Sequence, residues 1–376
     1  MLRFLTAGES HGPALIGIVE GLPAGLRVEP ELINRDLARR QIGVRRSART
    51  RIEHDRIEIM SGVVNGQTIG APVALKIENR DYANWKDKVV PPQTIPRPGH
   101  ADLAGAVKYG LDDLRLVAER ASARETAMRV ACGALARMLL AEFGIAVGSH
   151  VLEIGGVRAE IPDLPYPEIL VRAMGSDVCV ADQASSEKIV ARIQEVMHAQ
   201  DTVGGVIEIV ALNVLVGLGS HTQWDRKLDG RLAQAVMSVQ SVKGVEIGTA
   251  FENARHLGTE VQDEIFPVGA TRESPLQTKR NTNRAGGLEG GITNGMPIVI
   301  RAALKPIATT ATPLRSIDLA TGGPALAQYQ RSDFCHVPRA CVIGEVMVAW
   351  VLADALMEKI GGDSVREMKV HWESAR

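Results

Sequence analysis

The stretch GVVNGQTIGAPVALK, residues 62–76, sets the frame of the fold because the chain repeats its pattern at residues 291–305 as GITNGMPIVIRAALK. In each stretch an Asn-Gly pair, Asn65-Gly66 or Asn294-Gly295, precedes the lysine of an Ala-Leu-Lys sequence by the same interval. An Asn-Gly pair between β-rich runs predicts a tight hairpin turn. Two further stretches, 24–26 (AGL) and 216–218 (VGL), each close a β-run and precede a helix. We therefore expect an internally duplicated core.

A long helix is expected between the two halves, at residues 123–143, with Ser122 and Glu125 forming a capping box and Gly144 ending it. Apolar residues at helical spacing predict further helices at 30–40, 103–109, 187–200, 226–241 and 345–360. Runs rich in Val and Ile predict strands at 14–20, 56–63, 73–77, 206–216 and 298–304. The mixture indicates an α/β or α+β protein.

The composition is that of an ordinary globular protein. The 376 residues hold 43 Lys plus Arg against 44 Asp plus Glu, with 45% apolar residues, so the formal net charge is −1 and any attraction for polyanions must be local. Four cysteines without a CxxC pair suggest neither a zinc site nor a disulfide framework. We expect one domain over 1–376, no bound metal, no membrane span, no secretory signal and a cytoplasmic location.

Residues 35–56 contain eight arginines and no lysine. The planar guanidinium group suits bidentate hydrogen bonds to phosphate or carboxylate oxygens, so this segment is a candidate anion site. The other interpretation is a basic surface paired with Asp36, Glu53 and Asp55. The eight residues are Arg35, Arg39, Arg40, Arg45, Arg46, Arg49, Arg51 and Arg56.

Two histidines lie in turns where a side chain can reach a cleft. His11 stands in Gly8-Glu-Ser-His-Gly12, and His100 follows a turn stiffened by two prolines. Either could act as an acid near neutral pH, although a lone histidine is more often structural. Asp102 directly precedes a predicted helix, and we expect it to cap that helix.

Further candidates lie at the ends of predicted elements. Arg120 and Arg124 flank the start of the long helix, where backbone N–H groups favour an anion. Asp333, in an Arg-Ser-Asp turn before the last helix, could act as a base or orient a partner. Lys305 to Thr310 end a strand with one cation and two hydroxyls. The glycine-rich segment 285–291 is neither GxGxxG nor GxxxxGK[ST], so it does not support a dinucleotide or P-loop site.

Taken together, these motifs resemble chorismate synthase over nearly the whole chain. The matching segments follow in the family's order: GESHG (8–12), LARRQIG (37–43), SGVVNGQTIGAPVALKIEN (61–79), RPGHAD (97–102), ERASARETAMRVACGA (119–134), DTVGG (201–205), VKGVEIG (242–248), AGGLEGGITNG (285–295), LKPIATT (304–310) and RSD (331–333). The resemblance implies an α+β fold with a β-α-β sandwich core, in a homotetramer.

The resemblance also implies a reaction and a site. The reaction is the conversion of 5-enolpyruvylshikimate 3-phosphate to chorismate and phosphate by anti-1,4-elimination, a shikimate-pathway step that requires reduced FMN. The implied catalytic residues are His11, His100 and Asp333. The implied flavin contacts are Arg120, Ala121, Ser122, Arg124, Gln240, Ser241, Gly290, Lys305, Pro306, Ile307, Ala308, Thr309 and Arg331. The implied substrate contacts are Ser10, Arg40, Arg46, Arg49 and Arg129.

Within this resemblance, His11 would protonate the departing phosphate, His100 would protonate or polarise the reduced flavin, and Asp333 would help the flavin accept the ring proton. NADPH would be needed only if the chain reduces its own flavin, and we expect a separate flavin reductase instead. Gln240-Ser241 stands where the family often has Asn-Ala, and Phe334 where Pro is common.

Two alternatives come from other interpretations of the same residues. The Arg35 to Arg56 segment could bind nucleic acid, although that segment lacks aromatic side chains for base stacking. A phosphate lyase that uses His11 and His100 without flavin is the second. A bound yellow chromophore would separate a flavin enzyme from the latter.

Overall fold

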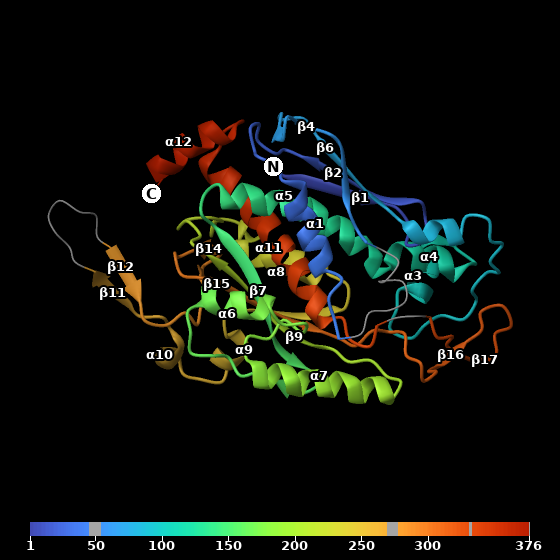
Figure 1. Cartoon of the computed structure of the whole chain (residues 1–376). Coiled ribbons are helices and arrows are strands. Elements are labelled where there is room, and N and C mark those ends of the chain that lie inside the picture. The colour runs from blue at the N-terminus through green and yellow to red at the C-terminus, as the bar shows by residue number, and fades with distance from the viewer. Residues whose placement is uncertain (45–53, 269–276, 331–332, 376) are drawn as a thin grey trace.

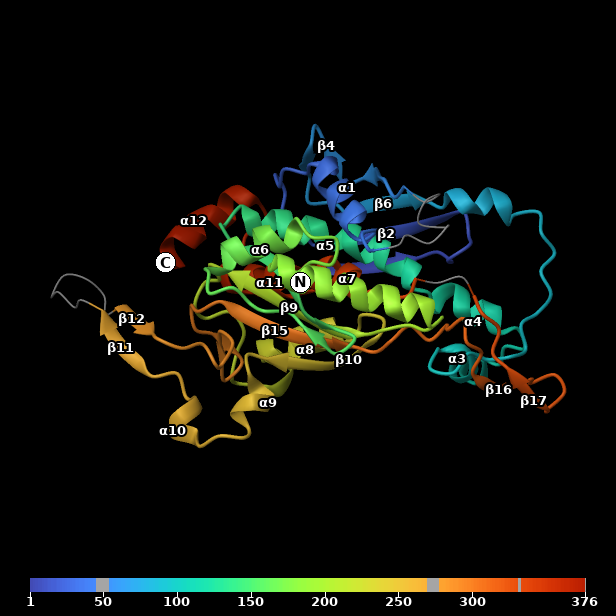
Figure 2. The ribbon, with the colours of Figure 1, turned by 60° about the horizontal axis from the view of Figure 1, so that its bottom comes forward.

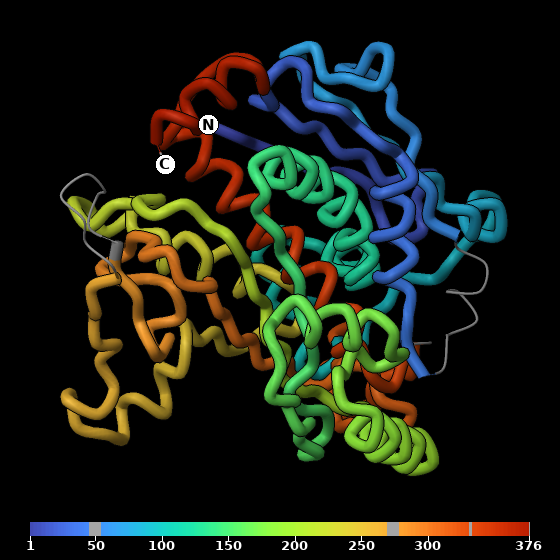
Figure 3. Tube along the Cα trace, turned by 60° about the vertical axis from the view of Figure 1, so that its left-hand side comes forward, coloured from blue at the N-terminus to red at the C-terminus, as the bar shows by residue number. Residues whose placement is uncertain are grey.

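The computed structural model describes residues 1–44, 54–268, 277–330 and 333–375. Two antiparallel sheets enclose a layer of helices (Figure 1). Helix α5 (Thr126–Ala141) packs on the first sheet and α11 (Val337–Ile360) on the second, while the two helices pack against each other. Figure 3 shows the N-terminal strands on one side of this layer and the green to orange strands on the other. The predicted α+β sandwich is confirmed.

The two sheets have the same strand order. The first runs β1 (Arg3–Ala7), β2 (Ala14–Glu20), β6 (Val73–Glu78) and β3 (Ile57–Ser61). The second runs β7 (Ala146–Ile154), β9 (Gly205–Leu212), β15 (Ile298–Leu304) and β10 (Val242–Ile247), with β8 (Val157–Arg158) added beside β7. In each half a helix, α1 (Pro30–Arg39) or α8 (Leu228–Met237), follows the second strand. The order supports the predicted duplication.

Matching hydrogen bonds anchor the two halves. In the first half the Gly25 N–H donates to the carbonyl of Thr68 at 2.8 Å, and the next amide along donates to the Thr68 hydroxyl at 2.9 Å. In the second half Gly217 donates to the carbonyl of Thr293 at 3.0 Å, and the next amide donates to the Thr293 hydroxyl at 2.9 Å. Both glycines have positive φ, 81° and 90°. The sequence pairing of residues 24–26 with 216–218 is therefore confirmed in structure.

The predicted hairpin turns fare differently in the two halves. Asn65 and Gly66, with φ of 50° and 76°, do connect β4 (Val63–Val64) to β5 (Gln67–Thr68). In the second half the turn between β13 (Leu288–Glu289) and β14 (Ile292–Thr293) is made by Gly290 and Gly291, with φ of 59° and 84°. The turn predicted at residues 294–295 was wrong because a Gly-Gly pair adopts the required left-handed conformations at least as readily.

Helix α11 is apolar on all sides because it is the central core helix. Its length and hydropathy would suffice to cross a membrane, but 89% of its most apolar window is buried inside the protein. Pro338 stands in its first turn, where a missing N–H costs nothing. The start predicted at residue 345 was wrong, because the helix begins at Val337 and Glu345 is buried within the helix layer.

Other boundaries shifted modestly. Helix α7 (Gln183–His198) begins earlier than predicted, after Asp182, whose side chain accepts from the Ser185 amide. Helix α8 ends before residues 240–241, and the long helix splits into a 3-10 turn η2 (Ala123–Glu125) and α5. The predicted capping box was wrong in its partners: the Ser122 hydroxyl accepts from the Arg124 amide, and the Glu125 side chain turns elsewhere.

The remaining elements, mostly short or at the periphery, are η1 (Arg80–Asn84), α3 (Asp102–Tyr109), α4 (Leu114–Ala121), α6 (Tyr166–Met174), η3 (Trp224–Arg226), α9 (Ala250–Asn253), α10 (Gly258–Val261), β11 (Ile265–Val268), β12 (Gln277–Arg280), β16 (Arg315–Ile317), β17 (Pro324–Leu326) and α12 (Val365–Ala375). Figure 2 shows the β11–β12 and β16–β17 hairpins projecting from opposite ends of the molecule. The second of these lies beside α3 and α4. That end holds the site described next.

Candidate functional site

His11 is held in the β1–β2 loop by a carboxylate of α4. Its Nδ1 lies 2.7 Å from Glu119 Oε1, and its amide donates to Glu119 Oε2 at 2.6 Å. The Ser10 amide donates to the Glu119 carbonyl, and the His11 ring lies 4.4 Å from that of Trp85, centroid to centroid. A carboxylate at Nδ1 fixes the tautomer and orientation of the imidazole. Glu119 is thus a site residue that the sequence analysis missed.

His100 has a similar arrangement. Its Nδ1 lies 2.6 Å from Asp102 Oδ1, and Arg97 Nε donates to the other oxygen of Asp102 at 2.7 Å. Burial would raise the pKa of Asp102, but the hydrogen bonds from Arg97 and His100 outweigh it and hold the pKa far below its usual range. The predicted capping role was wrong: Asp102 is the first residue of α3 and makes no cap hydrogen bond. Its carboxylate orients His100 instead.

A buried ion network joins the arginine-rich segment to the start of the long helix. Asp55 accepts from Arg40 at 2.8 Å and from Arg124 at 2.6 Å, while Arg124 also donates through Nε and a terminal nitrogen to the Asn79 amide oxygen. Burial would raise the pKa of Asp55, but the two guanidinium charges lower it. Burial lowers the pKa of Arg40; Asp55 opposes that shift and Arg124 adds to it. Two cations share one carboxylate here.

Asp333 lies at the edge of this network. It forms an ion pair with Arg339, whose Nε donates to the carbonyl of Ile42 at 3.0 Å. Arg339 also acts electrostatically on Arg40. The turn before α11 is therefore tied to the end of α1, although the two are far apart in the chain.

Lys305 connects two more predicted segments. Its Nζ donates to the carbonyl of Gly99, directly before His100, and its amide donates to the Ser241 carbonyl at 2.9 Å. Burial, followed by the charge of Lys243, lowers the pKa of Lys305. The strand end at Lys305 is therefore adjacent to both the His100 turn and residues 240–241.

Gln240 lies near the start of α5. Its amide nitrogen donates to Glu125 Oε2 at 3.2 Å, and Glu125 also binds Arg129 at 2.8 Å and the Thr6 hydroxyl at 2.8 Å. The Gln240 Oε1 atom is buried and has no hydrogen-bond partner among the described residues. A buried acceptor without a donor is rare in a finished protein interior. This edge of the site therefore fits a ligand that carries N–H groups.

Other predicted contacts have their own places. Arg120 donates to the Thr6 carbonyl and hydroxyl, both at 2.8 Å, with Ala121 and Ser122 directly after it. Thr309 is buried, and the Thr202 hydroxyl donates to the carbonyl of Ile307 at 2.8 Å, which fixes the Lys305 to Thr309 segment; Pro306 and Ala308 lie within it.

Gly290 lies in the turn between β13 and β14, and β14 lies on the opposite side of the molecule from α3 and α4 in Figure 1. This chain alone does not place Gly290 beside His11 or His100. Arg46, Arg49 and Arg331 lie outside the described residues. The flavin and substrate roles of all four stay predictions.

The cations of the site were predicted from the sequence, but most of their partners were not. Glu119, Asn79 and Glu125 lie in the quoted segments without having been assigned to the site, and Arg339 lies outside those segments; each contacts a predicted residue. Glu119 could have been proposed as a site residue from the sequence, because it directly precedes Arg120. Asp55 had been considered only as a partner of a solvated basic surface, and it is instead a buried partner inside the site.

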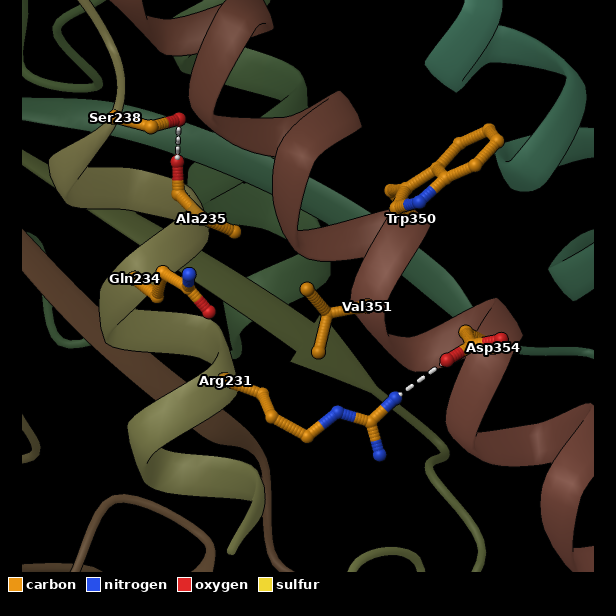
Figure 4. Close-up of a pocket in the computed structure, with 7 residues that line it drawn as sticks. All are labelled: Arg231, Gln234, Ala235, Ser238, Trp350, Val351 and Asp354. Carbon is orange, nitrogen blue, oxygen red and sulfur yellow. Dashed lines mark hydrogen bonds and ion pairs between the residues drawn. The ribbon is translucent and has the colours of Figure 1, made fainter. Parts of the chain in front are cut away.

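A cavity of about 310 Å³ lies elsewhere, between α8 and α11 (Figure 4). Arg231 and Asp354 form an ion pair of 2.7 Å at one end, and the Ser238 hydroxyl donates to the Ala235 carbonyl at the other. The remaining lining residues are Gln234, Trp350 and Val351. None of the predicted site residues lines it. Its cation is already neutralised, so it does not match a polyanionic ligand.

Comparison with known proteins agrees with this geometry. The family model described as chorismate synthase matches residues 2–357. Curated chorismate synthases from Desulforudis audaxviator and Geobacter sulfurreducens are 54% and 52% identical, covering 98% and 99% of this chain and 95% and 98% of their own. A solved crystal structure of chorismate synthase superposes with a TM-score of 0.80 at 44% identity, covering 99% of this chain and 96% of that one.

A site that joins carboxylate-held histidines to buried cations, on this duplicated fold, is that of an enzyme of the carbon–oxygen lyase class. The matches cover 98% and 99% of the chain. The chain belongs to the chorismate synthase family. Neither the fold nor the relatives favour the nucleic-acid-binding alternative.

Proposed function

We propose that this chain converts 5-enolpyruvylshikimate 3-phosphate to chorismate and phosphate by anti-1,4-elimination, and that it does so with reduced FMN in the site between His11, His100 and Lys305. The observation that carries the proposal is the pair of histidines held by carboxylates, together with Arg40 and Arg124, which both contact the buried Asp55. The substrate bears a phosphate and two carboxylates and the flavin another phosphate, so fixed cations are what this reaction needs.

The residues present fit a reduced flavin. The buried Gln240 Oε1 lacks a donor and Arg40 Nε lacks an acceptor among the described residues, so the site offers complementary atoms for a ligand with both N–H groups and anionic oxygens. The residues that would hold the flavin are Arg120, Ala121, Ser122, Arg124, Gln240, Ser241 and Lys305 to Thr309, with Gly290 and Arg331. When bound, reduced FMN supplies electron density that helps the C–O bond break.

His11 is proposed to protonate the departing phosphate. Its Nδ1 is engaged by Glu119, so Nε2 is the ring nitrogen that delivers the proton. The Glu119 carboxylate fixes the orientation of the ring, and a general acid must be held in place in this way. The proton moves from His11 to a phosphate oxygen as the ester C–O bond breaks.

His100 is proposed to protonate or polarise the cofactor. Asp102 stays ionised at neutral pH, as its lowered pKa requires, so a negative charge lies beside the ring and fixes its orientation. Arg97 limits this effect because its guanidinium neutralises the same carboxylate at 2.7 Å. His100 is thus positioned without a large local excess of negative charge.

Asp333 is proposed to help carry away the ring proton. Its ion pair with Arg339 fixes the carboxylate, and Arg339 in turn acts electrostatically on Arg40. Substrate anions would be bound by Ser10, Arg40, Arg46, Arg49 and Arg129. The Arg129 guanidinium is already shared between Glu125 and Ser238, so it would contribute chiefly by holding α5 against α8.

An anaerobic assay tests this function directly. Purified protein, chemically reduced FMN and 5-enolpyruvylshikimate 3-phosphate are mixed, and chorismate is followed by absorbance. We expect turnover with reduced FMN and none with oxidised FMN in air. Turnover that needs no flavin would instead support the flavin-free phosphate lyase.

We also propose that the chain forms a homotetramer through the outer face of the first sheet. Leu5, Ile16 and Ile18 are exposed there, and Leu5 pairs with Ile18 across β1 and β2. A flat apolar patch on a sheet is typical of a protein–protein interface. Ile18→Lys should lower the mass measured by light scattering, while Ile161→Lys, at an exposed loop position, should not. An unchanged mass for Ile18→Lys would reject this face.

The cellular setting follows from the same chemistry. We propose a cytoplasmic enzyme that acts as a single domain and receives reduced FMN from a separate flavin reductase, with NADPH needed only if the chain reduces its own flavin. All four cysteines are free, and three of them are buried, which fits a reducing compartment. Oxidation of added NADPH by the purified protein with FMN would show that no separate reductase is required.

A further inference from the structure

His336 is fixed at the N-cap of α11, between two residues of the proposed site. Its carbonyl accepts from the Arg339 amide at 3.0 Å, and the preceding segment is held by a hydrogen bond from the Val203 amide to the Phe334 carbonyl at 2.9 Å. Asp333 lies three residues before His336 in the chain. The backbone around His336 is therefore anchored on both sides.

Both ring nitrogens of His336 are buried, and neither has a hydrogen-bond partner within the part of the chain that the structure describes. A neutral imidazole carries one donor and one acceptor, and leaving both unmet in a protein interior is unfavourable. His150, which is also buried, differs because its Nε2 lies 3.1 Å from a Glu208 oxygen. The ligand-free protein thus retains a destabilising side chain at this position.

Two cations face the His336 ring. Burial, and then the charges of Arg339 and Lys305, lower the pKa of His336 to about 4. The ring is therefore neutral at physiological pH and keeps one N–H to donate. Arg339 is neutralised by Asp333, but over the described residues Lys305 has no carboxylate within ion-pair distance, and its Nζ donates only to a carbonyl. Positive charge beside an unused donor favours an anionic oxygen at this point.

We infer that His336 is a ligand-binding residue of this site, and that its ring N–H donates to an anionic oxygen held beside Lys305. The inference rests on the proposed function, which supplies two sources of such an oxygen: the phosphate of FMN, and the phosphate or carboxylates of the substrate. A side chain that serves to bind a ligand can lower the stability of the free protein, because its polar atoms stay unpaired until the ligand binds.

The test compares His336→Leu, which removes both ring nitrogens, with His336→Asn, which keeps a donor and an acceptor. Binding of FMN and of riboflavin, which lacks the phosphate, is measured by flavin fluorescence, and the substrate KM is measured at saturating reduced FMN. For His336→Leu we expect either an FMN affinity about tenfold weaker or a substrate KM about tenfold higher. The riboflavin affinity should be unchanged, and the melting temperature should equal or exceed that of the wild type. His336→Asn should recover part of the loss.

A loss confined to FMN assigns the flavin phosphate, and a loss confined to the substrate assigns a substrate anion. His371→Leu, at an exposed histidine on α12, is the control and should change neither affinity. Unchanged FMN affinity and KM in His336→Leu, equal losses for FMN and riboflavin, or a lowered melting temperature with normal affinities would each overturn the inference. If the wild type itself neither binds FMN nor turns over, the proposed function fails, and that result is separate from any difference between variants.

Discussion

Arg39 and Arg40 are neighbours at the end of α1, yet they belong to two different networks. Arg39 makes two hydrogen bonds of 2.7 Å to Glu345, and Arg137 binds Asp36 at 2.9 Å and Glu345 at 3.1 Å, so two cations meet two carboxylates. Around Arg40, as described, two guanidinium groups share Asp55. The first network is electrically complete, whereas in the second, within the described residues, Arg40 and Arg124 both contact the same carboxylate, Asp55.

The difference separates a structural ion network from a ligand site. Buried charges are costly unless they are paired, so a neutral network is stable as it stands. A network with excess positive charge is stabilised when an anion binds. The carboxylates that each arginine contacts, rather than the number of arginines, therefore distinguish the two regions of the same arginine-rich segment.

The largest expected effect is on the neutral network. Glu345→Ala removes the carboxylate that holds Arg39, Arg137 and the Ser149 hydroxyl, and leaves two buried cations with Asp36 alone. We expect a loss of about 3–5 kcal/mol in the free energy of unfolding, measured by denaturant titration. Glu142→Ala, which removes a surface partner of Lys369, should cost less than about 1 kcal/mol. Equal losses in the two variants would break the comparison.

The next effect belongs to the site. His11→Ala and His100→Ala should each lower kcat by about 10²-fold or more, because proton transfer loses its positioned group. Since neither histidine belongs to the apolar core, the free energy of unfolding should change by less than about 1 kcal/mol. Steady-state turnover under anaerobic conditions and denaturant titration provide the two measurements. Near-normal turnover in either variant would contradict that assignment.

Arg40→Met sharpens the contrast between neighbours. The substitution leaves the ion pair of Arg124 with Asp55 in place, so stability should be nearly unchanged, while the substrate KM should rise about tenfold for the loss of a charged hydrogen-bond donor. Arg39→Met should show the reverse, with KM preserved and stability lowered. A rise in KM for Arg39→Met and none for Arg40→Met would exchange the roles of the two residues.

The smallest effect is on the response to acid. Burial would raise the pKa of Glu345, but Arg39 and Arg137 lower it, so in the folded protein it releases its proton more readily than in the unfolded chain. The stability that it contributes is complete above its ordinary pKa of 4.5 and is lost as the pH falls below that value. Glu345→Gln should therefore flatten the dependence of stability on pH below 4.5, by at most about 1.4 kcal/mol per pH unit. A slope equal to the wild type's would contradict this.

Local sequence patterns located the strands that carry the fold. Strands β2 and β15 lie at the predicted residues because alternation and Val/Ile runs bounded by Gly or Pro are local signals. The start of α11 could not be read this way, since Glu345 is polar in sequence and buried by partners from α1 and α5. For the same reason the sequence indicated which cations exist, but not which of them Asp36 and Asp55 neutralise.

The matching hydrogen bonds of Thr68 and Thr293 show that the two halves of the core are alike, but the loops that connect their strands differ. Between β1 and β2 the chain turns tightly and places His11 against Glu119, whereas the corresponding passage from β7 to β9 travels through α6 and α7. The second half thus repeats the strand order of the first half without repeating its β1–β2 loop. The proposed site contains one His11–Glu119 pair, so each chain should turn over a single substrate molecule at a time although its two halves are similar.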